Sequence, residues 1–189
     1  MNLRRALLLC AVSLSVLGGA AACSKRSTAP SDPGAAPSAS VISIGVALGT
    51  CEDVGACEKE CADGSADRCR RLAASYATGQ GVEKDEARAT ALYEKACAMK
   101  DAPACVFAGQ MHEYAHGVPK DAAKAAGLYE RACDDGWPAG CYNYAIMLEA
   151  GRGVPADRAH AAALYQRVCD AGAKTACVKS EELGRDAGS

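Results

Sequence analysis

From Cys57 onward the sequence repeats itself every 36 residues, and this period constrains the fold more than any local preference does. Two series of cysteines keep the spacing, and Gly-Val and Leu-Tyr dipeptides recur between them. Units of this length cannot bury an apolar face alone, so they must stack on one another. The sequence therefore predicts a linear array of repeats. The cysteine series are Cys61, Cys97, Cys133 and Cys169, and Cys69, Cys105, Cys141 and Cys177.

Each repeat contains two helical stretches, which predicts an all-α fold of helical hairpins. One stretch follows the Gly-Val turn and opens at an aspartate that can cap it; the other opens near a proline at an early helical position. The aspartates are Asp85, Asp121 and Asp157, and the prolines are Pro103 and Pro138. The predicted organisation is an N-terminal half-repeat at 51–65, full repeats at 66–101, 102–137 and 138–173, and a C-terminal capping helix and tail at 174–189.

Disulfides are expected to hold this array together, because the chain is only 5% aromatic and its repeats bury little apolar area. The two cysteines of each pair lie four residues either side of one turn position. An antiparallel hairpin places such residues opposite each other, within the separation that a disulfide requires. Zinc is the alternative, but a seven-residue spacer is unlike the C-x2-4-C of structural zinc sites. The expected bridges are Cys61–Cys69, Cys97–Cys105, Cys133–Cys141 and Cys169–Cys177, with Cys51–Cys57 outside the series.

The pattern A-C-x-x-x-G-x-M-x-x-x-x-x-G-V, followed by D-x-x-x-A-x-x-L-Y-x-[KR]-A-C, resembles the Sel-one-like repeats, relatives of the tetratricopeptide repeat, and specifically their bacterial cysteine-rich Hcp group. Residues 117–121 (GVPKD) and 128–133 (LYERAC) carry the match best, and it covers about residues 57–186. The resemblance implies an all-α, right-handed α-solenoid. It also implies an alternative function, because some cysteine-rich members are described as penicillin-binding or as weakly penicillin-hydrolysing. The alternative is therefore a penicillin-binding protein or a weak β-lactamase-like hydrolase.

The residues themselves do not favour catalysis. Serine-based penicillin chemistry needs a lysine close to the nucleophile, as in S-x-x-K, and no serine here has a lysine three positions on. His112, Glu113 and His116 match the zinc motif H-E-x-x-H. The repeat nevertheless aligns His112 with packing positions and puts His116 in the turn before a glycine. We therefore expect a structural His112, no catalytic or metal-binding residue and no cofactor.

A short basic cluster, Arg68, Arg70 and Arg71, is expected to be a solvated face rather than an anion site. The whole chain carries 21 Lys and Arg against 23 Asp and Glu, a net charge of −2. A mildly acidic chain is a poor electrostatic partner for nucleic acid, so none is expected.

The first helix of each repeat carries positions that vary while the frame around them stays constant, and they recur at helical spacing. In tetratricopeptide-like solenoids the first helices line a concave groove, so these residues are expected to bind a protein or peptide; the alternative is ordinary surface. We call the following ten residues the first-helix stripe: Arg71, Ala74, Thr78, Phe107, Gln110, Tyr114, Asn143, Ile146, Lys179 and Glu182.

Residues 1–22 are typical of an export signal, with a basic start, an apolar run and small residues before Cys23. They resemble the lipobox of bacterial lipoproteins, although Ala20 stands where that pattern prefers Leu, and plain cleavage and secretion is the alternative. After the leader, ten cysteines follow Cys23, an even number that can pair completely. Cys23 is then free for lipidation, palmitate included. Ser24 stands where an Asp would resemble an inner-membrane retention signal. This favours an anchor in the outer membrane, on either of its two faces.

Residues 23–50 are expected to be the lipidated cysteine and a flexible Ser/Ala/Pro-rich tether to the membrane. Within them, residues 41–48 (VISIGVAL) form a β-prone run that could pack on the domain or end the linker. The predicted protein is an exported, lipid-anchored interaction scaffold of the cell envelope, with the penicillin-directed hydrolase as the alternative.

Overall fold

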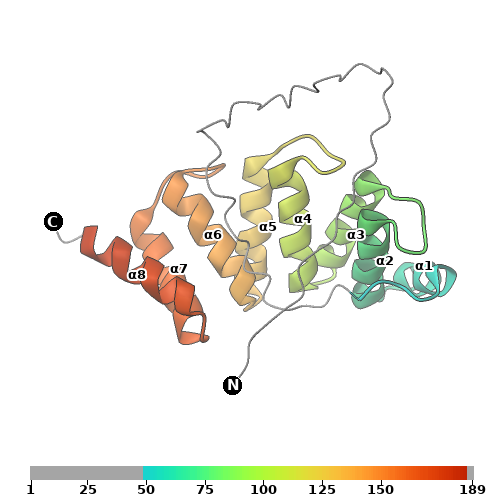
Figure 1. Cartoon of the computed structure of the whole chain (residues 1–189), viewed down its shortest axis with the longest axis horizontal. Helices are drawn as coiled ribbons and strands as arrows, with labels where there is room; N and C mark the ends of the chain where they lie inside the picture. Colours follow the sequence, from blue (N-terminus) through green and yellow to red (C-terminus); the bar gives the residue numbers. More distant parts are fainter. Residues whose placement is uncertain (1–48, 187–189) are drawn as a thin grey trace, which may run out of the picture. The chain divides into compact units, whose positions relative to one another are not determined.

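The computed structural model describes residues 49–186, and over this range it contains eight α-helices and no strand (Figure 1). The predicted signal peptide, Cys23 and most of the tether lie outside the described residues. None of the described helices has the length and apolar content that a membrane span requires. The helices are α1 (Val54–Ala62), α2 (Ala66–Thr78), α3 (Glu86–Ala98), α4 (Ala102–Tyr114), α5 (Ala122–Asp134), α6 (Pro138–Ala150), α7 (Arg158–Asp170) and α8 (Lys174–Asp186).

The helices pack in chain order, each against the next, as Figure 1 shows. The first helices of the repeats are α2, α4, α6 and α8, and the second helices are α3, α5 and α7, with α1 as the remnant of a preceding one. In addition, α4 contacts α6 directly, so neighbouring first helices also meet. The predicted all-α, right-handed α-solenoid of helical hairpins is confirmed.

The helix starts follow from the capping residues. Asp85, Asp121 and Asp157 are extended N-caps whose carboxylates accept hydrogen bonds from the backbone N–H three residues on. Asp101 caps α4 in the same way, and Pro103 occupies its first turn. Pro138 is the first residue of α6. These local signals fix where the helices begin and therefore the register of each hairpin.

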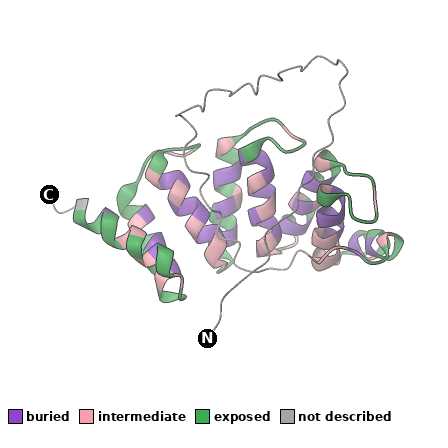
Figure 2. Cartoon of the chain, in the orientation of Figure 1, coloured by how far each residue is buried: buried purple, intermediate pink, exposed green. Residues whose placement is uncertain are grey.

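Small side chains and tyrosines make up much of the core, which lies where the helices face one another (Figure 2). The tyrosines of the Leu-Tyr dipeptides, Tyr93, Tyr129 and Tyr165, are 3%, 1% and 0% exposed. Glycine is needed where one of these rings lies against a helix: a Cβ added at Gly109 would come within 2.6 Å of Cε1 of Tyr129. The absence of a side chain there lets α5 approach α4 closely.

Disulfides join the ten described cysteines into five pairs: the four regular pairs that the repeat spacing predicts, and Cys51–Cys57, which lies outside the series. In the four regular pairs the Cα atoms are 4.3–4.7 Å apart, and in Cys51–Cys57 they are 6.2 Å apart. Each regular bridge ties a second helix to the first helix that follows it. The repeats begin at residues 66, 102 and 138, so each of these bridges links one repeat unit to the next. The bridges therefore hold the array in register.

Candidate functional site

The first-helix stripe is unevenly exposed (Figure 2). Ala74 is only 1% exposed and Asn143 only 8%, so neither side chain is presented to a ligand. The other eight members are partly or fully accessible. The exposed members are Thr78, Tyr114 and Glu182, and the half-buried ones are Arg71, Phe107, Gln110, Ile146 and Lys179.

Apolar groups occupy the middle of the stripe, on α4 and α6. The Phe107 ring lies 5.2 Å from the ring of Tyr93, centroid to centroid, and keeps part of its surface accessible. Tyr114 is 48% exposed, which is unusual in a chain with so few aromatic residues. Ile146 packs against the core cluster and is half-buried. This part of the stripe therefore offers apolar contacts to a ligand.

A buried carboxylate, Glu113, lies next to these residues on α4. Tyr129 of α5 donates a hydrogen bond to its Oε2 at 2.7 Å, and Nη1 of Arg152 lies 2.7 Å from its Oε1. Burial and the neighbouring Glu113 carboxylate both raise the pKa of Tyr129, so the phenol keeps its proton as the donor. Arg152 comes from the turn after α6, so the ion pair reaches from one repeat to the next.

The same arrangement recurs one repeat later at Glu149 on α6. Tyr165 of α7 donates to its Oε2 at 2.9 Å, and Nζ of Lys179 on α8 lies 3.5 Å from its Oε1. Lys179 also lies 3.8 Å from Glu182. Each carboxylate thus accepts a tyrosine hydroxyl of its own repeat and pairs with a cation of the next. Sequence reasoning missed both carboxylates, although Glu113 and Glu149 are 36 residues apart.

Asn143 is the buried polar member of the stripe whose hydrogen bonding is incomplete. Its Nδ2 is buried and has no hydrogen-bond partner. It occupies in α6 the repeat position that Lys179 occupies in α8, and Lys179 reaches Glu149, the counterpart of Glu113. Asn143 is thus the repeat counterpart of Lys179, but its own donor stays buried and unpaired.

The H-E-x-x-H residues do not assemble into a metal site. Helix α4 ends at Tyr114, so the helix does not carry His112 and His116 on one face. Nε2 of His112, a buried side chain, lies 2.6 Å from Oε1 of Glu94, whereas His116 is exposed in the turn. Residues 49–186 contain no group of three or more His, Cys, Asp or Glu side chains suited to holding a metal ion.

Glu94 also holds a second partner, Lys124, whose Nζ lies 2.6 Å from the same oxygen. Burial raises the pKa of the Glu94 carboxyl, but the hydrogen bonds from Lys124 and His112 outweigh it and leave the pKa below its ordinary value. Because Glu94 is on α3, His112 on α4 and Lys124 on α5, this group binds one repeat to the next. Its role is structural.

The three arginines of the basic cluster are paired internally. Arg68 lies 2.5 Å from Glu60, and Arg71 lies 2.7 Å from Asp67. Arg70 contacts Asp67 and lies 3.1 Å from Asp101, the N-cap of α4. The cluster therefore braces α2, and the expectation of a simple solvated face needs this correction. The cluster holds its own carboxylates, so it does not form a ready anion site.

The described serines also do not form a nucleophilic centre around a lysine. Ser75 is fully buried, and its Oγ accepts a hydrogen bond from the Cys51 N–H at 3.0 Å. Ser180 donates to the carbonyl of Ala162 at 3.3 Å. These contacts give no support to the penicillin-directed alternative.

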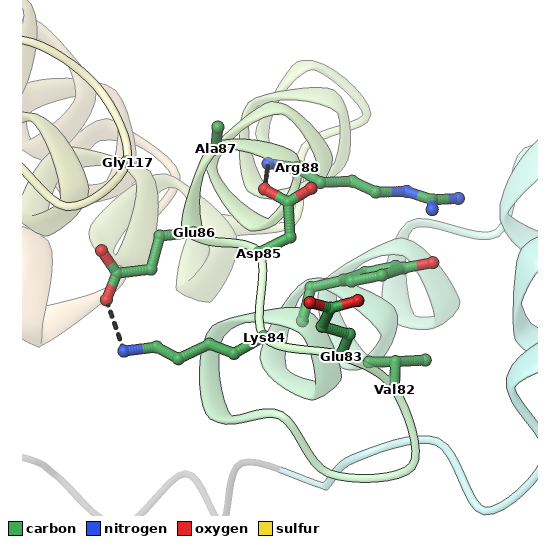
Figure 3. A pocket seen from close by; sticks show the side chains of 9 residues that line it. Val82, Glu83, Lys84, Asp85, Glu86, Ala87, Arg88 and Gly117 are labelled. Carbon is green, nitrogen blue, oxygen red and sulfur yellow. Dashed lines mark hydrogen bonds and ion pairs between the residues drawn. The ribbon is translucent and has the colours of Figure 1, made fainter.

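An open pocket of about 860 Å³ lies between the turn before α3 and the start of that helix (Figure 3). Most of its charged side chains have partners: Lys84 is 2.7 Å from Glu86, Asp85 caps α3, and Arg88 is 2.8 Å from Glu58. Arg88 also stacks 4.2 Å above the centre of the Tyr76 ring. The pocket is an open hollow beside one turn, so the stripe, which crosses several repeats, is the better candidate site.

Comparison with known proteins shows which repeat family this chain matches. A family model described as Sel1 repeat matches residues 69–101, 102–137 and 138–172, more than half of the chain. A search of curated proteins found no significant match.

Three solved structures share the fold. A protective antigen of uropathogenic Escherichia coli strains that displays an SLR fold is 24% identical, with a TM-score of 0.63, over 66% of this chain and 27% of its own. A Sel1 repeat protein from Oxalobacter formigenes is 24% identical, with a TM-score of 0.65, over 68% of this chain and 53% of its own. Cysteine rich protein B of Helicobacter pylori is 27% identical, with a TM-score of 0.51, over 66% of this chain and 86% of its own. This chain thus spans about a quarter and about half of the first two.

Proposed function

This chain belongs to the Sel1 repeat family, and on that premise we propose that it is an interaction scaffold whose first-helix stripe binds an extended peptide segment of a partner protein. Sel1 repeat proteins generally bind proteins. The stripe lies on the first helices, which meet one another where α4 contacts α6. A ligand lying across these helices would touch several repeats at once, which is how repeat arrays gain affinity.

The observation that carries the proposal is the accessible apolar surface of the stripe on α4 and α6. Tyr114 is 48% exposed, and Phe107 and Ile146 keep part of their surface accessible. An extended peptide that lies across these helices would place alternate side chains against them. Together these groups fit an extended segment with apolar side chains.

The test is selection of binders from a random peptide library displayed on phage, with the purified chain as the target. Synthetic copies of the selected peptides are expected to bind the native chain and to lose about tenfold in affinity with Tyr114→Ala, because burying an aromatic side chain contributes about 1.5–3 kcal/mol. Val178→Ala is the matched control, because it removes an exposed apolar side chain that is not a member of the stripe. The proposal fails if no peptide is selected, or if both variants weaken the peptides equally.

We further propose that the scaffold works in the cell envelope, anchored by a lipid on Cys23 and tethered by residues 24–50. Five disulfides in the described residues support an oxidising compartment, because such bonds rarely persist in the cytosol. The leader before Cys23 supports export, and Ser24 supports the outer membrane as the destination. Intact-mass analysis should find a diacylglyceryl and acyl group on an N-terminal Cys23. A free Cys23 thiol, or cleavage elsewhere, would refute the anchor.

A further inference from the structure

We propose that the Cys169–Cys177 bridge is a redox switch, which a dithiol reductant opens before the other bridges and which thereby releases α8 from α7. The switch goes beyond the proposed function and does not rest on it, because its opening can be observed in the chain alone. Three features of the described residues support it: the accessibility of this bridge, the small apolar surface that α8 buries, and a hollow beside the C-terminal half of α8.

The bridge between α7 and α8 is the most accessible of the described bridges. Cys169 and Cys177 are both half-buried, whereas the cysteines of the other four bridges are 0–6% exposed. Thiol–disulfide exchange requires a thiolate to reach one sulfur atom of the disulfide. A buried bridge meets this requirement only when the helices around it open. A reductant therefore reaches the Cys169–Cys177 pair first.

Helix α8 buries little apolar surface of its own. Among its described side chains, the buried apolar ones are Ala176 and Leu183, of which one is large. The equivalent helix of the preceding repeat, α6, buries three large side chains, Tyr144, Met147 and Leu148. Because burial of apolar surface is the main favourable contribution to helix packing, α8 depends more than α6 does on its bridge.

The C-terminal half of α8 is also loosely packed against its neighbours. In the middle of the helix, Lys179 lies 3.5 Å from Glu149 of α6, and the Ser180 hydroxyl donates to the carbonyl of Ala162 at 3.3 Å. Beyond these contacts, a hollow of about 440 Å³ lies between α8, the end of α6 and the start of α7. Its lining residues are Glu149, Arg158, Glu182, Leu183 and Arg185.

The bridge compensates for this loose packing. Closing a loop with a sequence separation of 8 favours the docked helix by about 60-fold in the chain-entropy model. Without the bridge, α8 should leave α7 more often by about the same factor, and Lys179 and Glu182 then leave the first-helix stripe with it. The redox state of one bridge therefore determines whether the stripe extends to α8.

The opening step is a thiol–disulfide exchange in which the dithiol supplies both electrons. One thiolate of the reductant attacks Sγ of Cys169, the bond between the two cysteine sulfurs breaks, and Cys177 leaves as a thiolate that takes up a proton. The second thiol of the reductant then loses its proton and attacks the mixed disulfide, so Cys169 is released as a thiol and the reductant becomes a disulfide. Cys177 is the better leaving group because it lies near the start of α8, where the helix dipole stabilises negative charge, whereas Cys169 lies near the end of α7.

Partial reduction of the native chain, with its disulfides formed, tests the selectivity. The chain is treated with dithiothreitol for increasing times, free thiols are alkylated with iodoacetamide, and peptide mapping by mass spectrometry locates them. Cys169 and Cys177 should be alkylated about tenfold faster than Cys133 and Cys141, a buried bridge with the same separation of 8. Earlier or equally fast reduction of any other bridge would overturn the proposal.

Hydrogen exchange tests the release of α8. In the double variant Cys169→Ser and Cys177→Ser, the backbone amides of α8 should exchange about 60-fold faster than in the native chain, while those of α5 keep their native rates. The double variant Cys51→Ser and Cys57→Ser is the matched control, because it removes the bridge that joins α1 to the preceding segment, and α8 should then exchange as in the native chain. Native protection of α8 without its bridge, or equal loss of protection in α5, would overturn the proposal.

Neither readout needs a ligand, so this proposal and the proposed function fail separately. Selective reduction and release of α8 would establish the switch even if no peptide binds the stripe. Simultaneous reduction of all the bridges would refute the switch and leave peptide binding by the stripe unaffected.

Discussion

Lys100→Gly should stabilise this protein, although it removes a side chain and adds none. Lys100 is the residue after Met99, the C-cap of α3, and has φ = 66°, in the left-handed region. The residues at the same position of the other repeat units are Gly64, Gly136 and Gly172, with φ of 100°, 80° and 99°. The backbone of this turn therefore adopts a conformation that is unfavourable for residues with a Cβ. Among the described repeat units, Lys100 is the one residue at this position that carries a side chain.

The magnitude follows from two opposing terms. A left-handed conformation costs an L-residue roughly 1–2 kcal/mol, and glycine costs roughly 0.5–1 kcal/mol through the greater entropy of the unfolded chain. The net gain expected for Lys100→Gly is about 0.5–1 kcal/mol, or about 2–4 °C in Tm for an array of this size. The hydrogen bonds of the turn survive, because the Lys100 and Asp101 N–H groups donate to the carbonyls of Cys97 and Ala96.

Thermal and urea unfolding followed by circular dichroism, with disulfides intact, measure the change. Lys100→Ala is the first control: it removes the charge but keeps the Cβ, so Tm should stay near that of the native chain. Gly136→Ala is the reverse control, because a Cβ there would meet no atom within 4 Å, and only the backbone conformation opposes it. It should lower stability by about 1 kcal/mol. A Lys100→Gly chain that is no more stable than Lys100→Ala would refute the reasoning.

Replacing Cys133 and Cys141 together by Ala should destabilise the array by about 2.5 kcal/mol, the loop entropy for a sequence separation of 8, measured by urea unfolding; an unchanged midpoint would contradict the role of the bridges. His112→Ala should cost about 2 kcal/mol, because it removes a buried hydrogen bond to a carboxylate, whereas His116→Ala in the exposed turn should stay within about 0.5 kcal/mol; equal losses accompanied by lost zinc would revive the metal site. Since the folded pKa of Glu94 is lowered, its contribution is present above the unfolded pKa and is lost as the pH falls through the folded value. Unfolding measured from pH 6 to pH 3 should therefore show a smaller loss of stability for Glu94→Gln than for the native chain.

Repeat-level features were accessible from the sequence because they depend on contacts between neighbours in the chain. Asp85 and its counterparts 36 residues apart cap helices through their own backbone, so the helix starts could be predicted. Cysteines four residues either side of a turn meet in any antiparallel hairpin. The end of α4 before His116 followed from the turn that the repeat places there. These arguments need no knowledge of how the hairpins stack.

Contacts between repeats were decided only by the tertiary structure. The pairing of Arg152 with Glu113 depends on the offset and angle between α4 and the turn after α6, which no local pattern encodes. The packing of α4 against α3 likewise joins His112 to Glu94, at a position that alignment of the repeats showed only to be a packing site. The stripe itself could be proposed from its variability, but whether a member is accessible depends on what stacks over it.

Sequence alone thus determined the all-α repeat, its caps and its cysteine spacing, because a 36-residue unit with local signals has few ways to fold. The stacked structure decided which side chains of the stripe remain available: it buries Ala74 and Asn143 and leaves Tyr114 48% exposed. Burial and hydrogen bonding between residues far apart in the chain arise only when successive hairpins pack, and the binding properties of the surface depend on that packing.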